Sequence, residues 1–360
     1  MKIFHIVSNK EWGGGEQYVY DLSLRQRADG IDIVIFCKPI EDIIRKYTEA
    51  GLQVIPLALG GALDLKSAWQ MATIINKEGA CTIHAHNFKD AFTACYARKL
   101  SSNKNVRVVM CRHLTRTGKN SILYRWLYSQ LDRLIFDSQI STDVFLSTNP
   151  TIDSNKLGIV HTSIVVPENI VPVNVRKEFN IPETSTVTMF HGRLDPEKGI
   201  DTLMDAVEQI KEKDFKLVLI GKGSDEYTEH LKTTINSKGI AEKIIFAGFR
   251  HPVLPYVAGA DFGILASTVR EGCPLSPQEY MSQGHPVVVT DNGGQREYVE
   301  DGRNGLLVTP GNAKQLAEAM GRLIDNPELR QKLGQQAKAD FDDHLSYEHY
   351  YAKICRIYNE

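Results

Sequence analysis

Four charged side chains in the second half of the chain have the types and spacing for work on a phosphorylated substrate. Arg193 and Lys198 lie in one short segment, 191–199, while Glu271 and Glu279 stand eight residues apart farther on. Two cations on one loop could straddle a diphosphate, since at an effective dielectric near 20 a charge pair about 4 Å apart contributes roughly 4 kcal/mol. One carboxylate could accept hydrogen bonds from a sugar and the other from a ribose. The alternatives are a solvated loop, in which Lys198 pairs with a carboxylate of its own segment, and two unrelated surface acids.

The chain between the two glutamates predicts a phosphate site. Glu271 comes just after a predicted strand, and a helix is expected to begin before Glu279. The start of a helix attracts anions because its first N–H groups have no partner within the helix. Pro274 has no N–H, so Leu275 and Ser276 are the predicted phosphate donors.

Three consecutive glycines, Gly13, Gly14 and Gly15, follow the first apolar run. A dinucleotide fingerprint would need Gly-x-Gly-x-x-Gly and an acidic residue about 20 positions later, and the chain has neither. Glycines can still let backbone N–H groups approach an anion at a helix that begins near Glu16. A flexible turn without a ligand is the alternative.

Short apolar runs alternate with amphipathic segments throughout and predict the elements that position these residues. The predicted strands are 3–7, 31–36, 53–57, 82–85, 106–110 and 134–137, and then 186–190, 216–220, 244–247, 262–265 and 287–290. The βαβ order indicates parallel sheets with helices on both faces, because right-handed crossovers need an intervening helix.

A proline-punctuated stretch at 165–173 interrupts this order and marks a domain boundary. We predict an α/β protein with two doubly wound, Rossmann-like domains, 1–170 and 171–344. A C-terminal helix at about 345–360 is expected to pack back on the first domain. Two such domains facing each other would leave a cleft between the carboxyl ends of their strands, where these sheets bind ligands.

Four segments in this order resemble glycosyltransferase family 4. They are Gly-Arg-Leu-Asp-Pro-Glu-Lys-Gly at 192–199, Leu-Ile-Gly-Lys-Gly at 219–223, the pair Glu271 and Glu279, and the Asn-Gly-Gly-Gln-Arg-Glu segment that opens 292–308. The resemblance covers nearly the whole chain and is strongest from about 186 to 310. It implies the GT-B fold and a retaining transferase that uses a nucleotide sugar.

The resemblance also implies roles for the charged side chains. Arg193 and Lys198 would hold the donor diphosphate, Glu271 would contact the donor sugar, and Glu279 would bind the ribose. For a retaining transfer it suggests same-face attack, in which the departing phosphate takes the acceptor proton and no side chain acts as nucleophile. No Asp-x-Asp pair is placed to hold a divalent ion in the predicted cleft, so we expect no metal and no cofactor besides the donor co-substrate.

Further donor contacts follow from the same resemblance. Gly14 and Gly15 would lie near the donor phosphates from the first domain, and His86, in His84-Ala-His86-Asn87, would lie beside the donor sugar. A structural role is the alternative for His86, and two histidines at i and i+2 are too few to fix a metal. The base pocket would be lined by four residues, namely Gly221, Gly223, Phe249 and Arg250.

Composition restricts the partners. The chain has 360 residues with 42 basic and 44 acidic side chains, so no global field draws it to nucleic acid. Its six cysteines form no Cys-x-x-Cys pair and are expected to be reduced, mostly in the core. No run of about 18 apolar residues occurs, and the first residues do not read as a signal peptide, so a cytoplasmic location is expected.

One basic segment, 111–133, mixes cations with aromatic side chains. Two interpretations of this segment are open. A solvated helix with a packed aromatic face is the commoner structure for such a segment, and peripheral contact with an anionic membrane surface, or with a lipid-phosphate acceptor, is the other.

The function that the resemblance implies is transfer of a hexosyl group to a sugar or lipid-linked acceptor, in bacterial surface polysaccharide or glycolipid assembly. Three alternatives stay open. A sugar-nucleotide epimerase would form product without an acceptor, a related phosphorylase would need inorganic phosphate, and a non-catalytic module would bind donor without turning it over.

Overall fold

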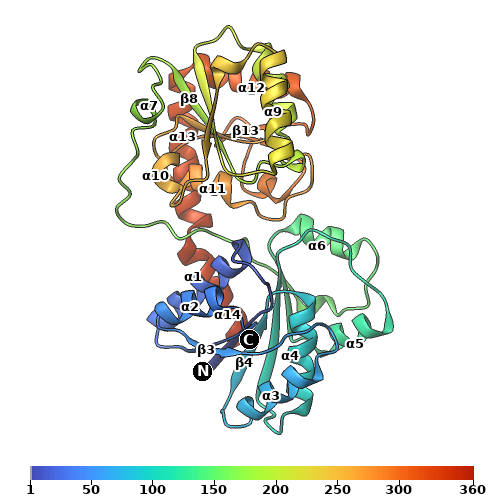
Figure 1. Ribbon diagram of the computed structural model, residues 1–360. Coiled ribbons are helices and arrows are strands. Elements are labelled where there is room, and N and C mark those ends of the chain that lie inside the picture. Colours follow the sequence, from blue (N-terminus) through green and yellow to red (C-terminus); the bar gives the residue numbers. More distant parts are fainter. Residues whose placement is uncertain (1) are drawn as a thin grey trace. The chain divides into compact units, whose positions relative to one another are not determined.

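The structure, a computed structural model, describes residues 2–360 and divides into two compact units (Figure 1). Unit 1 runs to His161 and also takes in Tyr351–Glu360, whereas unit 2 is Thr162–Tyr350. The boundary predicted from the prolines lies at residue 170, a few residues later in the chain. The C-terminal helix α14 (Tyr347–Asn359) therefore has most of its length in unit 1.

Unit 1 is built on a seven-stranded parallel sheet in the order β3-β2-β1-β4-β5-β6-β7. Its strands are β1 (Lys2–Val7), β2 (Asp32–Cys37), β3 (Gln53–Pro56), β4 (Cys81–Ala85), β5 (Val106–Arg112), β6 (Arg133–Phe136) and β7 (Leu157–Ile159). Its other helices are α1 (Gly14–Ala28), α2 (Glu41–Glu49), α3 (Leu65–Ile75), α4 (Phe88–Leu100), α5 (Ile122–Gln130) and α6 (Gln139–Leu146), with a 3-10 turn at Ser154–Lys156.

The two faces of this sheet are covered by different helices. Phe4 and Ile6 of β1, with Ile83 and Ala85 of β4, share a core with α3, α4, α5 and α6. Successive side chains in a strand point to opposite faces, so the residues between them point the other way. Figure 1 shows α1, α2 and α14 on that opposite face.

Unit 2 is built on a six-stranded parallel sheet in the order β10-β9-β8-β11-β12-β13. Its strands are β8 (Thr186–His191), β9 (Phe215–Ile220), β10 (Ile244–Gly248), β11 (Phe262–Leu265), β12 (Val287–Thr290) and β13 (Leu306–Val308). Its helices are α7 (Val175–Glu178), α8 (Ile200–Gln209), α9 (Asp225–Ser237), α10 (Leu254–Val257), α11 (Leu275–Ser282), α12 (Ala313–Asp325) and α13 (Pro327–Asp340). It also has 3-10 turns at Pro196–Lys198, Ala241–Lys243 and Gly294–Glu297, and a π-helical turn at Phe341–Leu345.

Two separate cores cover this second sheet. Phe190 and Leu219 pack on one face with residues of α8, α9 and α12. Met189 and Ile220 pack on the other face, in the core that contains Tyr280 of α11. The face that α11 covers is the one that bears on the site.

The predicted fold class, two doubly wound Rossmann-like units, is confirmed. Each predicted strand is present within one or two residues at its ends, and the strands at 262–265 and 287–290 have the predicted bounds. Two short edge strands, β7 and β13, were missed because each has only three residues, too few to show a period.

Two expectations from composition also bear on the structure. The six cysteines are free, and four of them, at 37, 81, 95 and 111, are buried. Among the residues that the structure describes, no helix combines the length and apolar character needed to cross a bilayer.

Candidate functional site

The predicted site residues follow the strands that flank the switch point of each sheet. The first six strands of each unit follow the same order, and unit 1 adds β7 at one edge. Connections therefore leave in opposite directions from β1 and β4 in unit 1, and from β8 and β11 in unit 2. Ligands of such sheets bind outside the carboxyl ends of the strands at this point. The residues concerned are Gly14 and Gly15 after β1, His86 after β4, Arg193 and Lys198 after β8, and Glu271 after β11.

Lys198 and Glu271 meet in an ion pair that joins the loops after β8 and β11. Lys198 Nζ lies 2.6 Å from Glu271 Oε1, and Ser267 Oγ donates to the same oxygen at 2.5 Å. About a fifth of each charged side chain is exposed. Lys198 therefore does not pair with its own segment, and that alternative is wrong.

The close approach of these loops depends on Gly199. This residue has φ +67°, and a Cβ there would lie 1.9 Å from the carbonyl oxygen of Ala266. A non-glycine residue would be strained in this backbone region and would also collide with the neighbouring chain. Gly199 thus allows Lys198 to reach Glu271.

Arg193 is placed differently from Lys198. Its side chain is 70% exposed and its guanidinium lies 3.2 Å from Asp195 Oδ2, on its own loop. The structure does not bring Arg193 into the Lys198–Glu271 contact. Contact with a diphosphate would require Arg193 to leave Asp195.

Glu279 contacts a histidine that the sequence reasoning did not select. Its Oε2 forms a short contact with Nε2 of His191, the last residue of β8. The other ring nitrogen, Nδ1, lies 2.8 Å from the hydroxyl of Tyr280, and that hydroxyl donates to the carbonyl of Met189 at 3.0 Å. Burial, and then the charge of Glu279, raise the pKa of Tyr280 well above its usual value, so the phenol keeps its proton.

The start of α11 offers two backbone N–H groups. Pro274 is the N-cap residue, and Leu275 and Ser276 are the first two helical residues. Pro277 comes next and, like Pro274, has no N–H. The first N–H groups of a helix have no partner within the helix, and two of these positions are prolines here. Any anion at the start of α11 would therefore bind the N–H groups of Leu275 and Ser276.

Gly221 and Gly223 have a structural reason to be glycines. A Cβ at Gly221 would lie 1.8 Å from the Gly192 carbonyl oxygen, and one at Gly223 would lie 2.4 Å from that of Leu194. These glycines let the loops after β8 and β9 lie side by side, and the Leu194 N–H donates to the backbone carbonyl of Lys222 at 2.8 Å. A base-pocket role for them stays a prediction.

Phe249 and Arg250 diverge after β10. Phe249 is 61% exposed, with the ammonium of Lys222 5.9 Å from its ring centre. Arg250 instead lies 3.5 Å from Glu178 and over the ring of Tyr256. Phe249 therefore presents an exposed ring on which a base could stack, whereas the guanidinium of Arg250 is engaged with Glu178 and Tyr256.

Gly14 and Gly15 begin α1, so the helix starts two residues earlier than expected. Glu16 closes this start, since its carboxylate accepts from the Gly13 N–H at 3.0 Å and from Asn9 at 2.5 Å. A Cβ at Gly14 would meet nothing within 4 Å, and one at Gly15 would meet only Asn9, at 3.7 Å. Packing within unit 1 therefore does not require glycine at either position.

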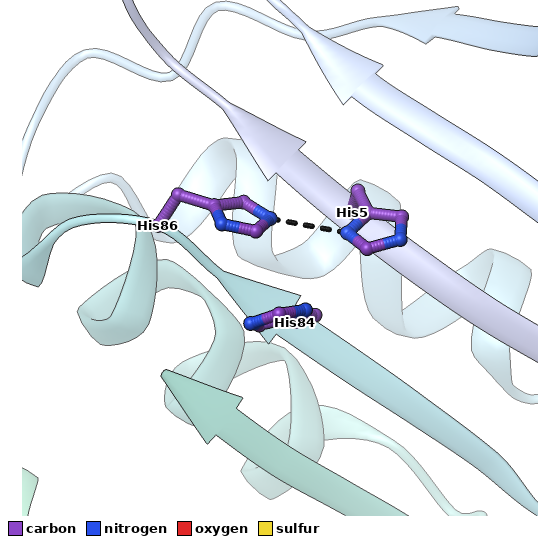
Figure 2. Close-up of side chains that lie close together, drawn as sticks. All are labelled: His5, His84 and His86. Atoms are coloured by element: carbon purple, nitrogen blue, oxygen red, sulfur yellow. Dashed lines mark hydrogen bonds between the residues drawn. The ribbon is translucent and has the colours of Figure 1, made fainter. Parts of the chain in front are cut away.

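His86 belongs to a cluster of three imidazoles with His5 and His84 (Figure 2). His5 contacts Gln26 of α1 and His84 contacts Tyr358 of α14, so both rings lie on the face of the sheet that these helices cover. One ligand atom from each of the three rings lies within 4.8 Å of the others. Burial lowers the pKa of His5 to about 4 and those of His84 and His86 well below their usual value. The rings are therefore neutral near pH 7.

The hydrogen bonds of this cluster fix the position of its protons. His5 Nε2 donates to Gln26 Oε1 at 2.8 Å, because an amide oxygen only accepts. The neutral His5 then accepts at Nδ1 from His86 Nε2, at 3.1 Å, as the dashed line in Figure 2 marks. His86 is left with a bare Nδ1, which is buried and has no hydrogen-bond partner among the described residues.

His84 connects the cluster to the C-terminal helix. Its Nδ1 lies 2.7 Å from the hydroxyl of Tyr358 in α14, and its Nε2 lies 3.0 Å from Cys111 Sγ. Neutral imidazoles suit Zn²⁺, but a metal ion here would have to displace the proton between His5 and His86. The sequence alone counted two histidines because His5 is remote in the chain, and β1 brings it beside β4.

The basic segment 111–133 is only partly exposed. Arg112 is buried, with its guanidinium over the rings of Phe88 and Phe145, so it is no surface cation. Leu114 and Ile122 are 58% and 86% exposed. Exposed basic residues lie between and after them, at 116, 119 and 125.

Known proteins share both the fold and the sequence pattern. HepE of Anabaena, solved in complex with UDP, superposes with a TM-score of 0.86 at 20% identity over 100% of both chains. A glycosyltransferase from Rickettsia africae gives a TM-score of 0.87 at 19% identity over 99% of this chain and 97% of that one. At such identities the likeness shows the fold, that of GT-B glycosyltransferases.

The sequence matches narrow this class to a family. The protein-family model described as Glycosyltransferase Family 4 matches residues 12–166, and the one described as Glycosyl transferases group 1 matches residues 174–340. EpsD of Bacillus subtilis, named as a glycosyltransferase, is 26% identical over 286 residues, 75% of this chain and 74% of its own. The chain belongs to glycosyltransferase family 4.

A further relative matches one half of the chain more closely. The lipopolysaccharide core biosynthesis glycosyltransferase LpsE of Rhizobium meliloti is 30% identical over 161 residues, which is 45% of this chain and 46% of the relative. The chain thus spans about half the length of several curated relatives that it matches.

Three residues at the site escaped the sequence reasoning: His191, Ser267 and Tyr280. His191 and Ser267 lie at or just beyond the carboxyl ends of β8 and β11, and that position was the available signal. Tyr280 gave none, because an aromatic residue in a helix is usually a core residue.

Proposed function

We propose that this family 4 glycosyltransferase moves a hexosyl group from a UDP-sugar to a saccharide or lipid-linked acceptor, with retention of configuration and without a metal ion. One observation carries the proposal. Lys198, Glu271 and Glu279 lie on the loops and helix that follow β8 and β11, and the start of α11 lies between the two glutamates in the chain. A single sheet edge thus offers a cation, two carboxylates and free N–H groups.

The proposed donor pose follows from charge. The diphosphate would take Lys198 and the Leu275 and Ser276 N–H groups, because these are the positive partners at the switch point. Glu279 would accept from the ribose hydroxyls and Glu271 from the sugar. The choice of uridine as the donor base is supported by a protein of the same fold, since HepE has been solved with UDP and with UDP-glucose.

The proposed chemistry needs no nucleophilic side chain. The bond between the anomeric carbon and the diphosphate oxygen breaks, the acceptor oxygen attacks the same face, and the departing phosphate takes the acceptor proton. Lys198 stabilises the leaving group and Glu271 the cationic sugar. His86, Gly14 and Gly15 would act from unit 1.

The proposed setting is surface polysaccharide or glycolipid assembly at the cytoplasmic face of a membrane. It rests on relatives such as LpsE, whose name places it in lipopolysaccharide core biosynthesis. The exposed Leu114 and Ile122, with basic residues between and after them, suit contact with an anionic lipid surface.

Ligand-dependent thermal stability tests the donor first. UDP-, GDP- and ADP-sugars are compared with and without EDTA, since a ligand at 100 times its dissociation constant adds about 2.7 kcal/mol of stability. Stabilisation by UDP-sugars that EDTA leaves unchanged is expected. Stabilisation by another nucleotide class, or only with a metal ion, would contradict the proposal.

Product analysis tests the reaction. With a stabilising UDP-sugar and an acceptor panel, release of UDP should depend on acceptor, and the NMR coupling of the anomeric proton should show retention. Turnover without an acceptor would indicate an epimerase, and turnover that needs inorganic phosphate would indicate a phosphorylase. Full kcat in Glu271→Gln would contradict the role of Glu271.

A further inference from the structure

The amide of Gln26 is held on both sides in the interior of unit 1. This residue of α1 is fully buried, as is His5 of β1. Its Nε2 donates to the hydroxyl of Tyr358 at 3.3 Å, and its Oε1 lies 2.8 Å from His5 Nε2. Since an amide oxygen only accepts, the proton of His5 lies at Nε2.

This amide also sets the proton of the next ring. Burial lowers the pKa of His5 to about 4 and that of His86 well below its usual value, so each ring carries one proton near pH 7. His5 Nδ1 is therefore bare, and its contact of 3.1 Å with His86 Nε2 is a hydrogen bond only if His86 donates (Figure 2). The single proton of His86 then lies at Nε2, and its Nδ1 can only accept.

The bare Nδ1 of His86 lacks a donor in the part of the chain that the structure describes. A buried acceptor without a partner is destabilising, so native proteins keep few of them. His113, directly after β5, also has a buried ring nitrogen without a partner, and the centres of the two rings are 6.1 Å apart. Because β5 pairs with β4, both rings lie beyond the carboxyl ends of neighbouring strands, where such sheets bind ligands.

The polar side chains around His86 have other partners. Asn87, the next residue, accepts from the Asp90 N–H at 3.0 Å and donates to the Asp90 carboxylate at 2.6 Å. The ring of Tyr18 packs edge-on against His86, but its hydroxyl contacts Cys111 Sγ at 3.5 Å. A ligand that satisfies His86 Nδ1 must therefore bring a donor hydrogen, as a sugar hydroxyl does.

We propose that Gln26 and His5 are positioning residues that hold His86 in the form whose Nδ1 only accepts, so that His86 selects a hydroxyl of the bound sugar. The inference rests on the proposed function, in which His86 contacts the donor sugar. A hydroxyl can donate to Nδ1, whereas a fluorine or a carboxylate oxygen in the same place cannot. The selection thus depends on a side chain of α1 that does not itself contact the sugar.

The protons can be observed directly in the ligand-free protein. Histidine ring nitrogens of the full ¹⁵N-labelled chain are recorded by long-range ¹H–¹⁵N NMR near pH 7, with His5→Phe and His86→Phe used for assignment. Single protonation at Nε2 in both rings supports the proposal. A proton on His86 Nδ1, or a doubly protonated ring at either position, overturns it.

Gln26→Leu tests whether the amide sets this order. Leucine has no acceptor, so the hydrogen bond between His5 and His86 can then run in either direction, and the ring ¹⁵N shifts of both residues should move toward averaged values. Unchanged shifts would overturn the positioning role of Gln26. The matched control is Cys111→Ser, in the same interior and 3.0 Å from His84 Nε2, which should leave the shifts of His5 and His86 as in wild type.

The selection is measured by calorimetric titration of a UDP-hexose, beginning with UDP-glucose, and of analogues in which one sugar hydroxyl is replaced by hydrogen or by fluorine. At one position both replacements should weaken binding equally, about threefold to tenfold, because fluorine cannot donate. In His86→Phe this loss should disappear. Fluorine that replaces the hydroxyl without loss at every position, or a loss that persists in His86→Phe, would overturn the proposal.

The two measurements separate failure of the proposal from failure of the proposed function. Absence of binding by every UDP-hexose would count against the proposed function, and the NMR result would still decide the positions of the protons. If His86→Phe does not fold, His86→Leu takes its place in both measurements.

Discussion

Two glycine substitutions separate a glycine kept for a ligand from a glycine kept for packing. Gly14 is the first residue of α1, has an ordinary φ, and would place a Cβ in open space. Gly221 has φ +148° and would place a Cβ 1.8 Å from the Gly192 carbonyl oxygen. The two sites therefore predict opposite effects of alanine on stability.

The magnitudes follow from these environments. Gly14→Ala should stabilise the fold by about 0.4–1 kcal/mol, because alanine lowers the entropy of the unfolded chain and fits the helix. Gly221→Ala should cost about 1–3 kcal/mol for the backbone conformation alone, and more for the displaced loop. If Gly14 lets the backbone approach the donor phosphates, its alanine variant should lose one charge-assisted hydrogen bond, about 1.5–3 kcal/mol, or roughly tenfold to a hundredfold in affinity.

The assay pairs urea unfolding with calorimetric titration of a UDP-sugar. The expected result is a Gly14→Ala protein that is at least as stable as wild type yet binds donor at least tenfold more weakly. Wild-type affinity in Gly14→Ala would refute the assignment of this glycine to the donor. A destabilised Gly14→Ala would refute the argument from open space.

Three more predictions address other residues. In steady-state kinetics, Lys198→Met should lower kcat/KM at least a hundredfold, about 3 kcal/mol, whereas Arg193→Ala, at an exposed side chain, should lower it less. A larger effect at Arg193 than at Lys198 would contradict this prediction. Burial raises the pKa of Asp90 to about 7, so the stabilising contribution of this carboxyl group is complete below pH 4 and lost as the pH rises through 7. In urea unfolding, Asp90→Asn should therefore be more stable than wild type at pH 8 but not at pH 4. Leu114→Ser combined with Ile122→Ser should reduce sedimentation with anionic vesicles, and equal sedimentation with neutral vesicles would argue against a charged lipid surface.

The fold could be predicted from the sequence because its strands and helices each produce a local pattern of apolar and polar residues. Buried parallel strands are continuous apolar runs, and the amphipathic segments between them have helical spacing. Strands β7 and β13 lacked this signal, since each lies at a sheet edge and has three residues.

The site was predictable only where chemistry and chain position coincide. Lys198 and Glu271 were selected as charged residues after predicted strands, and the structure joins them at 2.6 Å. Their direct pairing could not be foreseen, because it depends on the left-handed Gly199.

The histidine contacts were beyond the sequence reasoning for a related reason. His5 lies 81 residues from His86, and His191 lies 88 from Glu279, so only the sheet order brings each pair together. No pattern of local period contains information on such contacts.

Charge balance at the second switch point explains why so many of its polar groups are paired. A diphosphate brings negative charge to a sheet edge that already carries Glu271 and Glu279, and each like-charge contact about 4 Å apart would cost roughly 4 kcal/mol at an effective dielectric near 20. Lys198 neutralises the first carboxylate, and the second makes a short contact with His191 Nε2. Removal of Lys198 thus takes away a cation for the phosphate and also leaves Glu271 uncompensated beside it, so the loss should exceed that of a single phosphate contact.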